Sequence, residues 1–246
     1  MQTTSAATDI APARPSSTVV LLRQGDRLPE IFMVKRHKRS SFGSAYAFPG
    51  GVLESSDSNV HQLCSGRSPA EANTLLSVND MGLDYFSAAV RELFEEAGVL
   101  LGDTELSARE LAKARLGLND GSLRWDRFAN EHIKCIRCDQ MHYFSFWITP
   151  MQMTKRYSTR FFIAQLPAGQ AAIHDDGELT DSCWMTASDV LQASRDKTMR
   201  VHYPTRKTLE SIAAFNSVAE VSEWARSRED AGVRLIELDG IPESER

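Results

Sequence analysis

Three acidic side chains close together in the chain have the type and spacing to bind a metal ion. Glu92, Glu95 and Glu96 are three and four positions apart, so an α-helix would place their carboxylates on one face. Like charges at this spacing repel by roughly a few tenths of a kcal/mol per pair, and the single Arg91 cannot neutralise all three. Hard divalent cations such as Mg²⁺ bind several carboxylate oxygens at once. The triplet is therefore either a solvated acidic surface or one wall of a metal site.

A glycine turn upstream offers a further oxygen ligand. The segment Phe48-Pro49-Gly50-Gly51 predicts a tight bend, where an unhindered backbone carbonyl can approach an ion. The Gly50 carbonyl is thus a candidate ligand to accompany the three carboxylates.

Together, the turn and the acidic helix resemble the Nudix box, G-x5-E-x7-R-E-U-x-E-E-x-G-U, in which U is a bulky aliphatic residue. Residues 91–99, RELFEEAGV, match its second half at every fixed position, and Gly51 matches its first glycine. The first Glu of the pattern falls on Asp57, and residues 58–90 replace the x7 spacer. A helical insertion at 58–82 therefore interrupts the box, at a closure cost of only about 0.6 kcal/mol per doubling of loop length.

An interrupted box is similar to the branch of Nudix hydrolases that includes the peroxisomal coenzyme A diphosphatases. Segments that also look like this branch are 36–42, 147–150, 155–162, 176–184 and 203–205. The signature of coenzyme A-directed members matches only in its closing F-P-G-G, so coenzyme A and acyl-coenzyme A remain two candidates among several nucleotides.

The resemblance implies metal-dependent hydrolysis of a nucleoside diphosphate linked to another group. It implies that Mg²⁺ or Mn²⁺ is held by the three carboxylates and the Gly50 carbonyl, while Arg91 keeps the carboxylates in register. Asp57 and Glu178 are two candidates for the catalytic base. The candidate catalytic residues are thus Arg91, Glu92, Glu95, Glu96, Asp57 and Glu178, and the candidate substrate contacts are Lys35, Arg36, Trp147, Arg156 and Arg160.

Other functions stay open from the sequence. The substrate could instead be a nucleotide sugar, a dinucleotide cofactor or a capped RNA end, and the fold could serve as a nucleotide-binding module without turnover. The presence of all three helix carboxylates argues against such a module. Cys135 and Cys138 form a lone Cys-x-x-Cys without a second pair, which is weak evidence for zinc even with His132 and His142 nearby.

The elements that must position these residues follow from the hydrophobic pattern. Apolar and β-branched runs predict strands, and apolar residues at three- and four-residue steps predict helices. In the clearest helix, 84–97, Asp84 can cap the start and Gly98 the end. The predicted strands are 18–22, 31–35, 143–148, 161–164 and 179–185, and the other predicted helices are 69–76, 104–135 with a break at 119–121, 188–194 and 205–218.

This order predicts an α/β protein with a mixed sheet and helices on its faces. The resemblance specifies a Nudix α/β/α sandwich with additional C-terminal helices. We expect a flexible arm at 1–16, the Nudix domain at 17–225 and a polar tail at 226–246.

Composition limits the partners. Of the 246 residues, 42% are hydrophobic and 25% are charged, which is sufficient for a packed core. A net charge of −5 argues against DNA binding, and no apolar run reaches the roughly 18 residues of a membrane span. Four cysteines and the lack of an apolar leader indicate a reducing compartment, so we expect a cytoplasmic protein, as a monomer or homodimer, acting on a small molecule.

Overall fold

The computed structural model describes residues 11–37, 43–175, 177 and 179–238. Its centre is a mixed sheet in the order β10-β2-β1-β9-β8-β11, to which β3 adds beside β2 and β4 beside β1. The strands are β1 (Arg14–Gln24), β2 (Pro29–Arg36), β3 (Tyr46–Ala47), β4 (Gly50–Val52), β8 (His142–Ile148), β9 (Tyr157–Gln165), β10 (Leu179–Thr186) and β11 (Leu235–Glu237).

Strand β1 lies in the middle of this sheet and is buried on both faces. It runs parallel to β9, with Val19 opposite Phe162, and antiparallel to β2 and β4. Alternate side chains point to opposite faces of a strand, so Val19 and Leu21 enter one core while Val20 and Leu22 enter the other. The continuous apolar run therefore divides between two hydrophobic cores.

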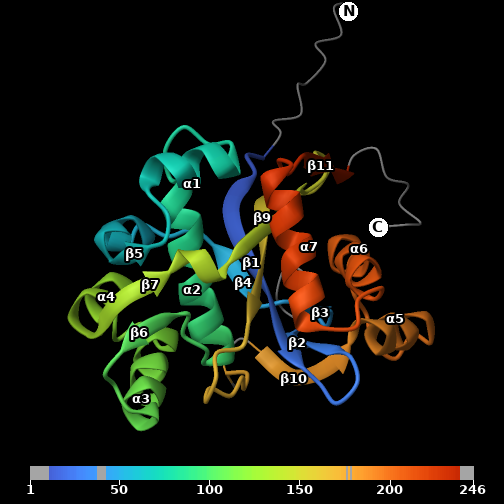
Figure 1. The fold of residues 1–246 in the computed structure, drawn as a ribbon, viewed down its shortest axis with the longest axis horizontal. Coiled ribbons are helices and arrows are strands. Elements are labelled where there is room, and N and C mark those ends of the chain that lie inside the picture. The colour runs from blue at the N-terminus through green and yellow to red at the C-terminus, as the bar shows by residue number, and fades with distance from the viewer. Residues whose placement is uncertain (1–10, 38–42, 176, 178, 239–246) are drawn as a thin grey trace, which may run out of the picture.

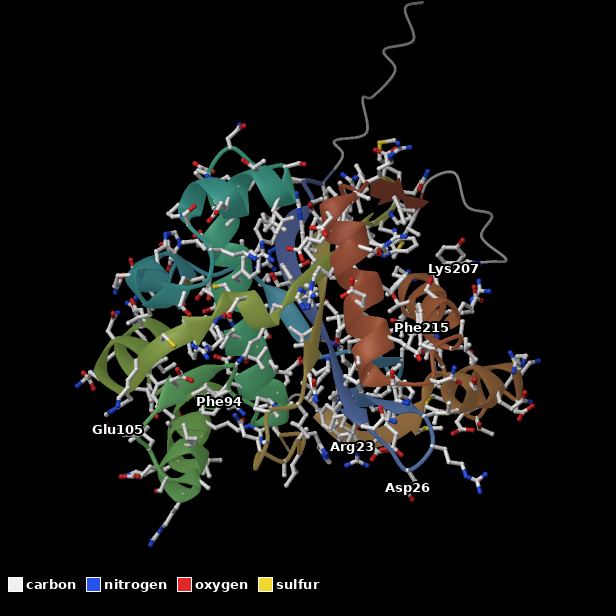
Figure 2. All side chains as sticks on the ribbon, in the orientation of Figure 1. Arg23, Asp26, Phe94, Glu105, Lys207 and Phe215 are labelled. Carbon is white, nitrogen blue, oxygen red and sulfur yellow. The ribbon has the colours of Figure 1, made fainter. Side chains whose placement is uncertain are left out.

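Helices cover both faces of the sheet, which confirms the predicted α/β/α sandwich (Figure 1). Figure 2 labels Phe94 in the first helical layer and Phe215 in the second. The first layer contains α1 (Pro69–Leu76), α2 (Gly82–Ala97), α3 (Ala108–Asn119) and α4 (Trp125–His132), and the second contains α5 (Ala187–Arg195), α6 (Tyr203–Ile212) and α7 (Val218–Asp230). Among the described residues, no helix combines the length and hydropathy needed to cross a bilayer.

Helix α2 forms as its apolar spacing predicts. Phe86, Val90 and Leu93 are fully buried against the sheet, and Gly98 ends the helix in the left-handed conformation at φ +71°. The start differs from the prediction, because Met81 is the N-cap and Asp84 instead pairs with His61 at 2.5 Å.

The insertion at 58–82 is folded. It contains the 3-10 helix η1 (Asp57–Leu63), the short strand β5 (Cys64–Ser65) and α1, whose Ser68 and Glu71 form a capping box. Strand β5 joins β6 (Gly102–Thr104) and β7 (Ile133–Arg137) in a second small sheet, and a second 3-10 helix, η2 (Cys138–Gln140), follows β7.

Two predictions from the pattern need correction. The segment 104–135 is helical over α3 and α4, with the predicted break at 119–121, but its two ends are not: Thr104 is the last residue of β6, and β7 begins at Ile133. The predicted polar tail at 226–246 contains the end of α7 and strand β11, and Val221 and Ala225 of α7 are fully buried. Strand β11 pairs in parallel with β8, so the C-terminal segment completes one edge of the sheet.

Candidate active site

The two halves of the interrupted box meet where β4 lies against α2. At Gly50, φ is +153° and a Cβ would lie 2.3 Å from the carbonyl oxygen of Ser17. At Gly51, a Cβ would lie 2.2 Å from Oε1 of Glu92. Gly50 therefore requires glycine, because the backbone of β1 occupies the space of its Cβ, whereas a side chain at Gly51 would have to push the Glu92 carboxylate aside.

Arg91 holds this junction together. Its side chain is 2% exposed, and its Nε and Nη2 donate to the two oxygens of Asp57, each at 3.0 Å. Nη2 also donates to the Val52 carbonyl at 2.8 Å, while Nη1 donates to Glu92 at 2.9 Å and Glu95 at 3.2 Å. One guanidinium thus contacts β4, η1 and the acidic face of α2. A residue that positions the carboxylates would make these contacts.

Glu96 links the helix to the glycine turn. Its Oε2 accepts the backbone N–H of Gly50 at 2.8 Å, and its Oε1 accepts from Nη2 of Arg36 at 3.1 Å. The same Nη2 donates to the Gly50 carbonyl. The backbone oxygen that the sequence suggested as a metal ligand is therefore in contact with an arginine.

The acidic cluster is short of positive charge. Burial raises the pKa of Glu95 to about 8; Arg91 opposes this shift, and the neighbouring Glu92 adds to it. Burial also raises the pKa of Glu92, again against the effect of Arg91. Carboxylates behave in this way when the nearby cations are too few to offset desolvation and mutual repulsion.

The donor set fits a hard divalent cation in its chemistry. Glu92, Glu95 and Glu96 supply carboxylate oxygens from one helix face, and the lack of a side chain at Gly51 makes room for the Glu92 carboxylate. Within the described residues, no group of three or more His, Cys, Asp or Glu side chains is already arranged around an ion position. The reason is that these carboxylates turn toward Arg91, Arg36 and the Gly50 N–H.

A cavity of about 1290 Å³ opens over this cluster, larger than the roughly 300–1,000 Å³ of many ligand pockets. The carboxylates line one end. Trp147 lies away from them, because β8 is three strands from β4 in the sheet, and it packs edge to face on Tyr203 with ring centroids 5.9 Å apart. Because α2 belongs to the first helical layer and α6 to the second, the cavity reaches across both layers.

Comparison with known proteins assigns the family. A model of the NUDT19 Nudix domain matches residues 71–210, more than half of the 246-residue chain. The chain belongs to the NUDT19 Nudix domain family. This membership confirms the resemblance drawn from the interrupted Nudix box.

The chain is also similar to one curated protein and, in its fold, to one crystal structure. Acyl-coenzyme A diphosphatase NUDT19 of Xenopus laevis is 25% identical over 243 residues, covering 81% of this chain and 63% of that protein. The chain thus spans less than two thirds of that relative's length. A Nudix hydrolase from Alicyclobacillus acidocaldarius superimposes with a TM-score of 0.67 at 24% identity, covering 87% of this chain and 97% of that one.

The predicted Nudix-box residues occupy different environments. Glu92, Glu95 and Glu96 line the cavity, whereas Asp57 is fully buried beneath Arg91 and is not among the lining residues. A catalytic base must reach the proton it removes, so Asp57 as the base stays a prediction that this buried position does not favour. Glu178 lies outside the described residues, although its neighbour Gly177 lines the cavity.

Of the five predicted substrate contacts, Arg36 and Trp147 line the cavity and the other three do not. Lys35 lies over the Tyr46 ring, with Nζ 5.3 Å from its centroid, and Arg156 donates to the carbonyls of Thr149 and Ala11. Arg160 is buried and stacks on Phe146, 3.6 Å from its centroid.

Strand alternation explains the direction of Arg160. Tyr157, Thr159 and Phe161 of β9 face the cavity, so Arg160 must point to the opposite face of the sheet. Lys155, in the bend before β9, lines the cavity, and β1 brings Arg14 beside Tyr157 on the same wall. The sequence pattern could predict neither residue, because Lys155 lies outside the strand and Arg14 depends on strand pairing.

The two cysteines of the Cys-x-x-Cys lie in different surroundings. The thiol of Cys135 donates to Asp103 at 3.1 Å, while Cys138 is fully buried.

Proposed function

We propose that this protein is a divalent-cation-dependent Nudix hydrolase that cleaves the diphosphate linkage of a nucleoside diphosphate derivative. The observation that carries the proposal is the cluster of Glu92, Glu95 and Glu96, held against the Gly50-Gly51 turn at one end of a large cavity. This carboxylate cluster alone would repel a diphosphate, so we expect a cation to accompany the substrate there.

We propose a different role in the reaction for each of several cavity residues. The three carboxylates would hold a divalent cation, which would neutralise charge at the diphosphate and lower the pKa of an attacking water. Arg91 keeps the carboxylates in place from beneath. Glu95 has the most exposed side chain of the three, at 22%. We therefore propose that Glu95 accepts the proton of that water.

The other end of the cavity fits the nucleoside. Trp147 and Tyr203 present aromatic surface, while Arg14 and Lys155 bring positive charge to the same walls. A heteroaromatic base with nearby phosphate groups has matching chemistry. The name of the Xenopus relative makes coenzyme A and acyl-coenzyme A the first substrates to test.

The test is hydrolysis of a substrate panel by the purified chain with Mg²⁺ or Mn²⁺. The panel contains coenzyme A, acyl-coenzyme A, a nucleotide sugar, a dinucleotide cofactor and capped RNA. We expect hydrolysis of at least one, and Glu95→Gln to lower kcat about 100-fold or more. Glu223→Gln, which changes a carboxylate on α7 that is 71% exposed, is the matched control.

Two results would contradict the proposal at different points. If no compound is consumed but one binds tightly, the fold acts as a binding module. If Glu95→Gln and Glu96→Gln remain fully active, the protein is a hydrolase whose active site lies elsewhere.

A further inference from the structure

The guanidinium of Arg36 lies where the fold offers ligands to a cation. Its Nη2 donates both to the carbonyl oxygen of Gly50 and to Oε1 of Glu96. These two oxygens belong to the turn and the helix that we propose as the metal-binding walls. We propose that Arg36 acts as the resident cation of the metal-free protein, and that a divalent ion displaces it into the cavity.

Arg91, the other arginine of the cluster, cannot make this exchange. It is 2% exposed, and Asp57 and Val52 hold its Nε and Nη2. Moving it would leave the fully buried carboxylate of Asp57 without its ion-pair partner. A buried charge that loses its partner is strongly unfavourable, so Arg91 stays in place.

Arg36 is more accessible than Arg91. It is the last residue of β2, its side chain is 24% exposed, and it lines the cavity. Once displaced, its guanidinium remains in the open cavity, where water or an anionic ligand can solvate it. The two oxygens it leaves are hard ligands that a divalent ion can take over, so neither becomes an orphaned buried acceptor.

The exchange prepares the cavity for an anion in two ways, a consequence that rests on the proposed function. Replacing a monovalent guanidinium with a divalent ion adds positive charge at the carboxylates. The freed Arg36 then faces the space above them, and guanidinium groups match phosphate oxygens in geometry. The metal ion therefore binds before the diphosphate and makes an arginine available to it.

Manganese binding without substrate tests this exchange directly. Free Mn²⁺ is measured by electron paramagnetic resonance in titrations of the full chain, comparing wild type with Arg36→Met. The variant keeps an apolar stem but has no competing cation. We expect it to bind Mn²⁺ about two- to fivefold more tightly, the effect of removing one partly exposed charge pair.

The matched control is Arg23→Met. Arg23, labelled in Figure 2, pairs with Glu30 and is 43% exposed outside the cavity. It produces the same change in net charge, so an effect of net charge alone would appear in both variants. We expect its Mn²⁺ affinity to equal that of wild type.

The outcomes separate this inference from the proposed function. If wild type binds Mn²⁺ and hydrolyses a substrate but Arg36→Met binds Mn²⁺ no more tightly, only the exchange is wrong. If wild type binds no Mn²⁺, both proposals fail. Should Arg36→Met not fold, Arg36→Lys serves instead, because one ammonium cannot reproduce the guanidinium bridge. Lysine should give an affinity between those of wild type and Met, and weaker binding than wild type would overturn the exchange.

Discussion

The contact between Asp57 and Arg91 decides how the interrupted box is held together. Both side chains are buried, and two parallel N–H···O bonds of 3.0 Å join them. Asp57→Ala leaves the guanidinium buried without its main partner. We expect the free energy of unfolding to fall by about 3–5 kcal/mol, measured by urea denaturation.

An exposed ion pair provides the comparison. Arg127 and Glu131 pair at 3.1 Å on α4, but their side chains are 72% and 51% exposed. Glu131→Ala should lower the free energy of unfolding by less than about 1 kcal/mol. Similar losses for Asp57→Ala and Glu131→Ala would contradict the structural role of Asp57.

Gly51 tests the contact between the turn and the acidic helix. A methyl group there would lie 2.2 Å from Oε1 of Glu92, so Gly51→Ala must push this carboxylate aside. We expect Mn²⁺ affinity and kcat each to fall about tenfold or more, with a loss of only about 1 kcal/mol in the free energy of unfolding. Wild-type Mn²⁺ affinity in this variant would show that Glu92 is not a ligand.

These residues differ in how far the sequence could predict them. Glu92, Glu95 and Glu96 could be predicted because helical spacing alone fixes which side chains share a face. The role of Asp57 could not, because it was assigned by counting from Gly51, whereas its burial depends on how η1 packs under Arg91. Spacing identifies neighbours on one element, but not contacts between distant elements.

Helix α1 shows that the insertion is part of the domain core. Leu76 is fully buried in the cluster that contains α2, and its carbonyl accepts from Arg160 at 3.2 Å. Leu76→Ala should lower the free energy of unfolding by about 2–5 kcal/mol, as judged by denaturation. Leu116→Ala, at a side chain of α3 that is 68% exposed, should cost less than about 0.5 kcal/mol. A negligible effect of Leu76→Ala would mark the insertion as a dispensable loop.

The same contrast explains which helices and strands could be predicted. Helix α2 has a continuous apolar stripe and a glycine that ends it, so pattern alone located it to within two residues at its start. Helix α7 could not be predicted in this way. Most of its residues are polar or charged, and the burial of Val221 and Ala225 depends on how the helix docks against the sheet. Helices stabilised by packing rather than by composition need the tertiary structure to be recognised.

Because the cavity is lined by both helical layers, a substitution far from the carboxylates should change substrate binding without changing the rate of the chemical step. Tyr203 lines the end away from the carboxylates and packs edge to face on Trp147. Tyr203→Leu keeps apolar volume but removes the aromatic face. We expect KM for a nucleoside diphosphate derivative to rise about two- to tenfold, with kcat unchanged.

The control for Tyr203→Leu is a diphosphate ester that carries an alkyl group in place of the nucleoside. Its KM should be the same in wild type and variant, because it has no ring to pack on Tyr203. An equal rise in KM for both compounds would mean that Tyr203 shapes the cavity without recognising the base.

The central position of β1 determines which fragments of this protein can fold. The family match begins at residue 71, yet β1 and β2 lie between β9 and β10 in the sheet. A fragment of residues 71–210 would therefore lose the strands that join its own two sides, together with Arg36, Gly50 and Asp57. Such a fragment would keep the acidic helix but neither the scaffold nor the opposing wall, so we expect it to be insoluble and inert when expressed alone.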